Sequence, residues 1–189
     1  MITTAALQPA CFLDRDGTLN VDHDFVHRPD EWDWIPGVPD ALLRLQRAGY
    51  KLIVVTNQSG ISRGRYTESD VRQLHKWVDL QLQQAGARID EWYLAAHHPR
   101  FDPPPHKFPP EDRKPGSGMF LKAARKHDID LKNSLMAGDK ISDLKPALNL
   151  GMTPCFIRSR HEPNQDKKWL SHRKIDTYNR LLDVVEKVI

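Results

Sequence analysis

The run Lys51-Leu52-Ile53-Val54-Val55-Thr56 constrains the fold of this chain more than any other stretch. An unbroken aliphatic and β-branched run of this kind is typical of a strand that is buried on both faces. Such strands belong to parallel sheets that helices cover on both sides. The run therefore predicts a protein of the α/β class.

Further apolar runs alternate with helical segments along the chain. The expected strands cover residues 11–13, 51–56, 92–96, 135–138 and 154–157. The expected helices cover residues 37–49, 67–86, 119–126 and 141–150, and a last helix begins at about Tyr178 and buries Leu181, Leu182, Val185 and Val188. Thr67 is a suitable N-cap because Asp70 lies three residues further on. Residues 159–173 are polar, and no pattern assigns them to a helix or a strand.

This alternation predicts a Rossmann-like three-layer sandwich with a mostly parallel central sheet. Because no repeat or linker interrupts the sequence, we expect residues 1–189 to form a single domain. No large insertion follows the first or the second expected strand, so we also expect no large cap domain.

Composition and charge exclude several function classes. The net charge is +3 and no long basic run appears, so nucleic acid is not an expected partner. No apolar stretch is long enough to span a bilayer, and residues 1–9 lack the features of a secretory signal. Cys11 and Cys155 lie in expected strands and should be buried thiols. These features favour a cytoplasmic enzyme or binding domain, which we expect to be a monomer without membrane partners.

Two carboxylates, Asp14 and Asp16, follow the first expected strand, and Gly17 allows a sharp turn after them. Carboxylates this close repel each other unless a cation lies between them or one of them holds a proton. Hard oxygen ligands of this kind suit Mg²⁺. The stretch therefore indicates a magnesium site, although an Asp-Gly turn without function explains it equally well when it is taken alone.

Polar side chains also gather near the ends of the other expected strands. They are Thr56, Asn57, Gln58 and Ser59 after the second strand, Arg113 and Lys114 before the third helix, and Asp139, Lys140 and Asp143 after the fourth strand. Taken singly, these groups could be a helix cap, a solvated surface pair and a turn. In a parallel sheet, however, the carboxyl ends of the strands are where ligands bind. The joint occurrence of these groups predicts one site at that edge.

Several motifs of the sequence resemble those of a known family. The stretches similar to the four motifs of haloacid-dehalogenase-type phosphatases are Asp14-Arg15-Asp16-Gly17-Thr18, Thr56-Asn57, Lys114, and Gly138-Asp139 with Asp143. The resemblance covers residues 10–158. The longer stretches Asn20-Val21-Asp22-His23 and Arg113-Lys114-Pro115 resemble the branch that hydrolyses the 7-phosphate of D-glycero-D-manno-heptose 1,7-bisphosphate. The histidinol-phosphatase branch is its close relative.

The resemblance implies an aspartyl-phosphate mechanism. Asp14 would attack phosphorus, and Asp16 would protonate the leaving sugar oxygen and then deprotonate the attacking water. That role requires Asp16 to hold a proton while Asp14 is ionised, so we expect their surroundings to separate their pKa values in that direction. The resemblance also implies that Mg²⁺ is held by the Asp14 carboxylate, the Asp16 main-chain carbonyl and Asp139.

The same resemblance assigns roles around the phosphoryl group. Thr56 and Asn57 would donate hydrogen bonds to its oxygens, and Lys114 would add positive charge there. Asp143 would orient Lys114 or a metal-bound water rather than bind the metal directly.

The side chains that would line the sugar-phosphate pocket, again by resemblance, are Asp22, His23, Phe25, Gln58, Ser59, Arg113 and Lys140. Arg113 could reach the second phosphate with its planar guanidinium. The alternative is that Arg113 forms a surface pair with Asp112 or Glu111.

The resemblance is incomplete in the proline-rich loop at residues 97–115. Members of the family usually hold a structural zinc there through Cys-x-His and a later Cys-x-Cys. The corresponding positions here are Ala95, His97, Pro110 and Asp112. Because only His97 remains as an expected zinc ligand, we predict that the zinc is absent. The side chains of His97, His98, His106 and Asp112 could in principle bind a metal, but solvated loop histidines are the simpler interpretation.

The sequence therefore predicts a magnesium-dependent phosphatase that removes the 7-phosphate of heptose 1,7-bisphosphate during the synthesis of nucleotide-activated heptose for surface polysaccharide. The same chemistry could serve histidinol phosphate, another small phosphomonoester or a nucleic-acid 3′-phosphate, because 3′-end phosphatases share the Thr-Asn-Gln feature. The lack of a basic stripe is evidence against the nucleic-acid substrate. A catalytically silent binding module is the remaining possibility, against which the intact Asp14, Asp16, Lys114 and Asp139 argue.

Overall fold

A six-stranded sheet organises the computed structural model, which describes residues 6–159 and 164–189. The strands are β1 (Ala10–Leu13), β2 (Lys51–Asn57), β3 (Glu91–Ala95), β4 (Leu135–Gly138), β5 (Thr153–Ile157) and β6 (Thr177–Tyr178). Their order in the sheet is β3-β2-β1-β4-β5-β6, and every neighbouring pair is parallel. The α/β class and the parallel sheet predicted from the sequence are confirmed.

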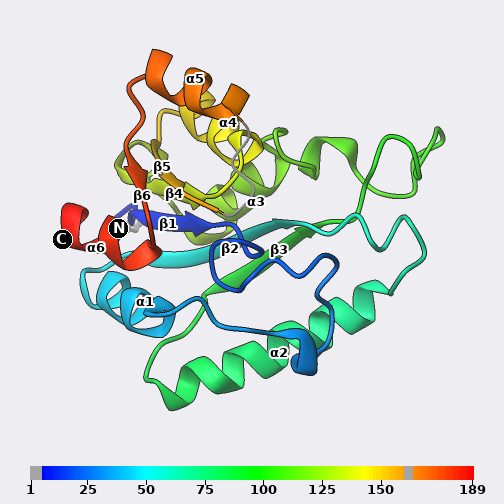
Figure 1. Cartoon of the computed structure of the whole chain (residues 1–189), viewed down its shortest axis with the longest axis horizontal. Helices are drawn as coiled ribbons and strands as arrows, with labels where there is room; N and C mark the ends of the chain where they lie inside the picture. The colour runs from blue at the N-terminus through cyan, green and yellow to red at the C-terminus, as the bar shows by residue number, and fades with distance from the viewer. Residues whose placement is uncertain (1–5, 160–163) are drawn as a thin grey trace, which may run out of the picture.

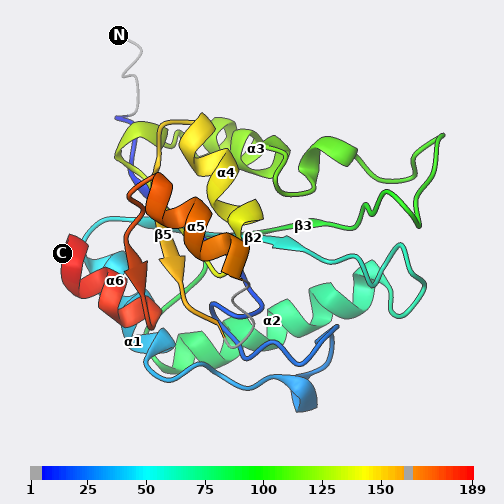
Figure 2. The same ribbon diagram turned by 45° about the horizontal axis from the view of Figure 1, so that its top comes forward.

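Helices cover both faces of the sheet, which makes the three layers (Figures 1 and 2). One face carries α1 (Val38–Arg47), α2 (Glu68–Gln84) and α6 (Leu181–Val188). The other face carries α3 (Gly118–His127), α4 (Ile141–Asn149) and α5 (Asn164–His172). Short 3₁₀ helices lie at η1 (Pro29–Glu31), η2 (Pro110–Asp112) and η3 (Leu131–Asn133). No cap domain is present in the part of the chain that the structure describes.

The central strands are buried on both faces because their side chains alternate between two apolar cores. In β1, Leu13 packs with α1, α2 and α6, whereas Phe12 packs with α3, α4 and α5. In β2, Val54 packs in the same core as Leu13, and Val55 packs in the same core as Phe12. Full burial of a side chain of this size stabilises the fold by roughly 1.5–3 kcal/mol. The double burial explains why residues 52–55, between Lys51 and Thr56, are all apolar.

The start of α2 has the local structure that its sequence predicts. The Thr67 hydroxyl oxygen accepts a hydrogen bond from the Asp70 N–H at 3.2 Å, and the Asp70 carboxylate accepts one from the Thr67 N–H at 2.7 Å. This capping box satisfies backbone donors that the first helical turn leaves free. Cys11 and Cys155 are free, buried thiols, as predicted.

The C-terminal part differs from the sequence prediction. The last helix begins at Leu181 rather than near Tyr178, because Tyr178 belongs to β6, which pairs with β5. Val184 is buried there together with Leu181 and Val185, whereas Leu182 and Val188 are only partly buried. In the unassigned segment at residues 159–173, the structure adds α5, while residues 160–163 lie outside the described residues.

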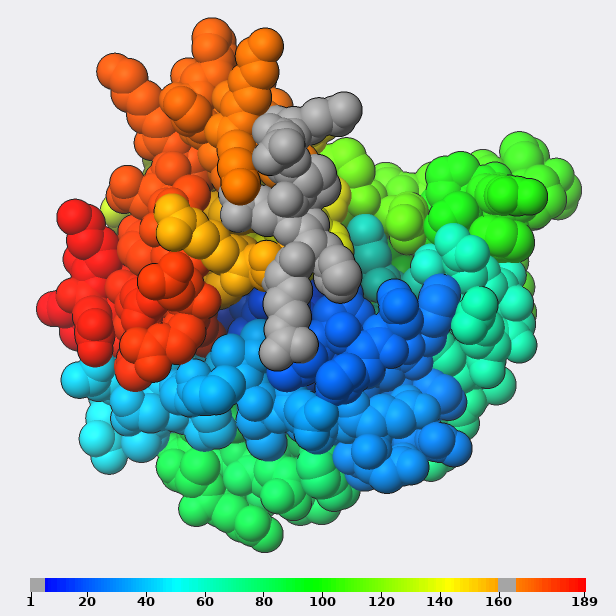
Figure 3. All heavy atoms as spheres, viewed as in Figure 1, coloured from blue at the N-terminus to red at the C-terminus, as the bar shows by residue number. Residues whose placement is uncertain are grey.

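Loops at the carboxyl ends of the strands gather on one side of the sheet. The segments after β1, β2 and β3 lie at this edge, and the loop after β3 projects outward from it, in green in Figure 3. None of the helices described here is both long and apolar enough to cross a bilayer.

Candidate active site

Asp14 lies directly after β1, and almost none of its surface is exposed to solvent. One of its carboxylate oxygens accepts a hydrogen bond from the Arg15 N–H at 2.7 Å and lies 2.8 Å from Nζ of Lys114. Gly17 follows with φ +83°, and a Cβ at this position would come within 2.4 Å of Asp139 Oδ2. Glycine is therefore required here both for its backbone conformation and for the close approach of Asp139.

Three buried carboxylates meet at the ends of β1 and β4. Oxygens of Asp14, Asp139 and Asp143 lie within 4.8 Å of one another. Burial, and then the charge of Asp143, raise the pKa of Asp14 to about 6. Burial also raises the pKa of Asp139 to about 8, and Asp139 Oδ1 has no hydrogen-bond partner among the described residues. Crowded buried carboxylates with an unpartnered oxygen fit a divalent cation such as Mg²⁺.

Lys114 lies between two of these carboxylates. Its Nζ is 2.8 Å from Asp14 and 2.8 Å from Asp143. Burial alone would lower the pKa of Lys114, but the charges of Asp14 and Asp143 outweigh it and raise the pKa. The Asn57 side chain fixes the Lys114 backbone, because it accepts a hydrogen bond from the N–H at 3.0 Å and donates one to the carbonyl at 3.1 Å. These contacts use one of the two hydrogens on Asn57 Nδ2, so the other is left to donate a further hydrogen bond.

Asp16 is held by donors away from the three-carboxylate group. Its Oδ1 accepts hydrogen bonds from Arg15 at 2.8 and 3.1 Å and from Asn20 at 3.1 Å. Its Oδ2 accepts one from Nε2 of Gln58 at 2.9 Å. Burial raises the pKa of Asp16, but the Arg15 charge and these hydrogen bonds outweigh it, so the net pKa is lowered.

The pKa values of Asp14 and Asp16 are therefore separated in the direction opposite to the one expected from the sequence. The expectation was wrong for this arrangement because every neighbour of the Asp16 carboxylate is a hydrogen-bond donor. Donors favour the ionised form of a carboxylate. In Asp14, by contrast, burial and a neighbouring carboxylate favour the neutral form.

Gln58 connects the first and second loops. Its Nε2 also donates to the Thr56 hydroxyl oxygen at 2.9 Å, and its Oε1 accepts from the Tyr66 hydroxyl at 2.8 Å. Gln58 is itself buried, so it supports Asp16 and Thr56 from beneath the site rather than lining an open pocket. Sequence reasoning missed Tyr66, because only the fold brings its hydroxyl to Gln58.

The first loop and Lys140 line the same cavity of about 400 Å³. Lys140 Nζ lies 3.3 Å from Asp22, and His23 lies 2.7 Å from Asp33. Further residues that line this cavity are Gly17, Val21, Ile35, Asp139, Ile157, Arg158, Ser159, Asp166 and Asn179. The side chains that follow Ile157 are not part of any sequence motif, so only the tertiary structure identifies them.

Arg113 and Phe25 do not belong to the lining of this cavity. Nη1 of Arg113 donates to the His97 carbonyl at 3.1 Å, and Arg113 forms no ion pair with any described residue. The surface pair considered from the sequence therefore does not form, because Asp112 pairs with Lys122 instead. Phe25 has φ 61°, and its ring faces Arg65 at 4.0 Å. Ser59 is half-buried beside Gln58.

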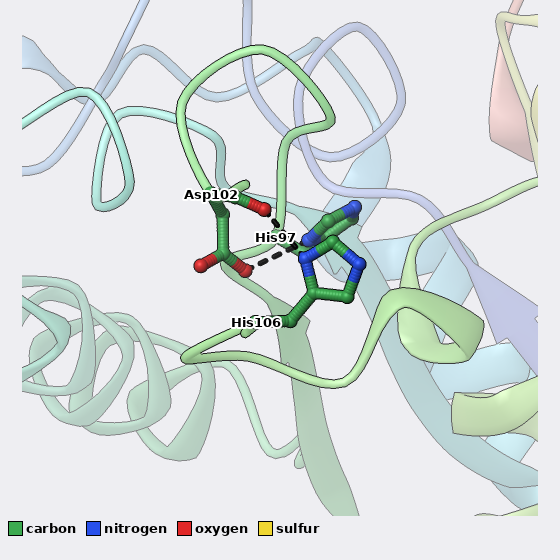
Figure 4. Close-up of side chains that lie close together, drawn as sticks. All are labelled: His97, Asp102 and His106. Atoms are coloured by element: carbon green, nitrogen blue, oxygen red, sulfur yellow. Dashed lines mark hydrogen bonds and ion pairs between the residues drawn. The ribbon is translucent and has the colours of Figure 1, made fainter. Parts of the chain in front are cut away.

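The loop after β3 brings together only some of the residues considered as metal ligands. His97, Asp102 and His106 form a compact group (Figure 4). His98 and Asp112 are not members of that group. Asp102 was not anticipated from the sequence, because its spacing to the histidines matches no metal motif.

The parallel sheet, the buried Asp14 after β1, the lysine beside it and the acidic group after β4 together define a haloacid-dehalogenase-type phosphatase. The comparisons with known proteins narrow this class. The family model for polynucleotide kinase 3 phosphatase matches residues 10–175. The chain is 46% identical over 153 residues to D-glycero-β-D-manno-heptose-1,7-bisphosphate 7-phosphatase of Yersinia pestis, covering 80% of this chain and 81% of the relative.

Two further relatives agree with this match. The protein of the same name from Photorhabdus laumondii is 45% identical over 139 residues, which cover 74% of each chain. The crystal structure of D,D-heptose 1,7-bisphosphate phosphatase from B. bronchiseptica, complexed with magnesium and phosphate, is 31% identical and has a TM-score of 0.80, with 95% of this chain and 97% of that chain covered. The protein described here belongs to the family of these heptose-bisphosphate phosphatases.

Proposed function

We propose that this protein is a magnesium-dependent phosphatase that hydrolyses the 7-phosphate of D-glycero-D-manno-heptose 1,7-bisphosphate. The observation that carries the proposal is the buried Asp14, which has Lys114 at 2.8 Å and the acidic group of Asp139 and Asp143 beside it. The names of the relatives support the substrate. The product would enter the synthesis of nucleotide-activated heptose.

Asp14 is the nucleophile in this proposal. Its carboxylate attacks phosphorus in line, the bond to the sugar oxygen breaks, and an aspartyl-phosphate forms. The second displacement, by water, regenerates Asp14 and releases phosphate. Lys114, Thr56 and Asn57 stabilise the negative charge that spreads over the phosphoryl oxygens during each displacement.

Asp14, the Asp16 main-chain carbonyl and Asp139 would hold Mg²⁺, and Asp143 would act on Lys114, which it already contacts at 2.8 Å. Bound Mg²⁺ would neutralise phosphoryl charge and allow an anionic nucleophile to approach an anionic substrate. The raised pKa values of Asp14 and Asp139 support this assignment, because a cation relieves the repulsion that raises them.

Asp16 transfers the proton in this proposal. It protonates the leaving sugar oxygen and later removes a proton from the attacking water. To hold a proton, its side chain must leave the hydrogen bonds from Arg15 and Gln58, which favour its ionised form. We therefore propose that Asp16 rotates toward the substrate as the substrate binds.

Asp22, His23, Phe25, Gln58, Ser59, Arg113 and Lys140 would recognise or support the sugar phosphate. The description of the matching family model suggests a nucleic-acid 3′-phosphate as the substrate. The small net charge of +3 favours a small-molecule substrate instead. Histidinol phosphate as the substrate and a catalytically silent binding module are the hypotheses that compete with this proposal. The monomeric state, the single domain and the cytoplasmic location stay predictions from the sequence.

Phosphate release by the purified protein with Mg²⁺ tests the proposal. The substrates are heptose 1,7-bisphosphate, histidinol phosphate and a 3′-phosphorylated oligonucleotide. We expect a preference in kcat/KM of about a hundredfold for the bisphosphate, with heptose 1-phosphate as the product. Comparable rates on all three would reject the heptose assignment, and the absence of release from any of them would reject the enzyme.

A further inference from the structure

One buried carboxylate that the catalytic steps do not use organises the loop after β3. The side chain of Asp102 is 6% exposed, and its Oδ2 lies 2.8 Å from Nδ1 of His97. The N–H groups of Lys107 and Phe108 donate to the same carboxylate at 2.8 and 3.2 Å. The Asp102 carbonyl lies 2.6 Å from Nδ1 of His106 (Figure 4). Asp102 therefore connects the two sides of the loop.

The two histidines both turn Nδ1 toward Asp102. A carbonyl oxygen only accepts hydrogen bonds, so Nδ1 of His106 must carry the proton in its contact with Asp102. The hydrogen bond from His97 lowers the pKa of Asp102, which keeps that carboxylate an acceptor. Each histidine thus donates its Nδ1–H to Asp102, and only its Nε2 is left as a possible metal ligand.

The loop that Asp102 holds contacts two arginines at the edge of the active site. The His97 carbonyl accepts a hydrogen bond from Nη1 of Arg113 at 3.1 Å. The ring of Phe101, next to Asp102 in the chain, lies 4.3 Å from the Arg63 guanidinium, which belongs to the loop after β2. Both contacts are made by residues that precede Asp102 in the loop.

Arg63 and Arg113 both contact the loop that Asp102 holds, and neither has an acidic partner among the described residues. Neither forms an ion pair with any residue in the described ranges 6–159 and 164–189. Burial, and then the charge of Arg63, lower the pKa of Arg113, which shows that the two cations repel each other. Two neighbouring guanidinium groups without a carboxylate favour an anion such as a phosphate group.

We propose that Asp102 is a positioning residue that fastens the loop at residues 97–108 and thereby holds Arg113 and Arg63 as a pair for the phosphate that is not cleaved. This rests on the proposed function, which supplies a substrate with a second phosphate. Asp102 fastens the loop through its hydrogen bonds to His97, His106, Lys107 and Phe108.

The test compares Asp102→Asn with Glu111→Gln, a control on the same loop whose side chain is exposed and makes no hydrogen bond within the described residues. The asparagine amide replaces one acceptor oxygen by an NH₂ group. It therefore cannot accept all the hydrogen bonds that His97, Lys107 and Phe108 donate to the Asp102 carboxylate. We expect KM for heptose 1,7-bisphosphate to rise about tenfold, the effect of weakening one charged hydrogen bond, with kcat unchanged. Hydrolysis of p-nitrophenyl phosphate, which has no second phosphate, should be unaffected in both variants.

Arg63→Gln is the second variant, because it keeps the proposal testable should Asp102→Asn fail to fold. Its control is Arg125→Gln, which removes an exposed arginine from α3. Arg63→Gln should raise KM for the bisphosphate but not for heptose 7-phosphate, and the control should raise neither. An unchanged KM in both Asp102→Asn and Arg63→Gln would overturn the inference while leaving the proposed function intact.

Two measurements on the wild-type protein complete the test. If the protein does not distinguish the bisphosphate from heptose 7-phosphate, both the proposed substrate and the assignment of the arginine pair are wrong. Titration with Zn²⁺ checks whether the loop binds a metal instead. Stoichiometric binding that raises Tm and is lost in Asp102→Asn would overturn the hydrogen-bonded arrangement in favour of a metal site.

Discussion

Replacing Lys114 with methionine should destabilise the protein strongly in the absence of metal. The Lys114 side chain is 1% exposed and lies 2.8 Å from both Asp14 and Asp143. Methionine has a similar length, so the substitution removes the charge and leaves little cavity. Removing one partner of a buried ion pair leaves uncompensated buried charge and costs about 3–5 kcal/mol. For a chain of this size, that loss corresponds to a fall in Tm of roughly 10 °C.

Magnesium should restore part of this loss. In the variant, Asp14, Asp139 and Asp143 have no buried cation among them, so a divalent ion relieves more repulsion than it does in the wild-type protein. We therefore expect the variant to gain more stability from Mg²⁺ than the wild-type protein does. Activity should stay low even with Mg²⁺, because the positive charge beside the phosphoryl group is lost.

Urea unfolding at pH 8 measures the effect, first with a chelator and then with Mg²⁺. Arg72→Met is the control, because it also removes a cation that pairs with a carboxylate, that of Glu68, but in a pair whose side chains are 59% and 42% exposed. Exposed pairs contribute about 0–1 kcal/mol. If Lys114→Met is as stable as Arg72→Met in chelator, the reasoning about the buried ion pairs is refuted.

The remaining predictions concern three other positions. Asp14→Asn should abolish turnover and prevent the enzyme from retaining labelled phosphate after rapid quench; full residual activity would show that Asp14 is not the nucleophile. Gly17→Ala should weaken Mg²⁺ binding measured by calorimetry, because the new Cβ would lie 2.4 Å from Asp139 Oδ2. His75 stacks on Trp92 at 4.0 Å, and burial lowers its pKa well below the usual value. As the pH falls below about 6.5, the imidazole of His75 takes up a proton in the unfolded chain but not in the folded protein. The free energy of unfolding should therefore decrease by up to about 1.4 kcal/mol for each unit that the pH falls. His75→Phe should remove this part of the pH dependence in urea titrations at pH 5 and 7, and an unchanged slope would contradict the assignment.

Much of the fold could be predicted because its signals are local in the sequence. Residues 52–55 are all apolar, and they form the part of β2 that is buried on both faces. Thr67 and Asp70 define the start of α2 through a capping box four residues long. β6 was missed because two residues, Thr177 and Tyr178, carry no pattern of their own and become a strand only by pairing with β5.

The sequence by itself determined which side chains meet at the edge of the sheet. Asp14, Lys114 and Asp139 follow recognisable motifs, and the strand order brings them together. Only the tertiary structure decided how these groups are charged and supported. The pKa of Asp16 is lowered first by Arg15, its neighbour in the chain, and then by Asn20 and by Gln58, which is 42 residues away. Such effects depend on burial and on distances between side chains, and neither quantity is encoded in any short stretch of sequence.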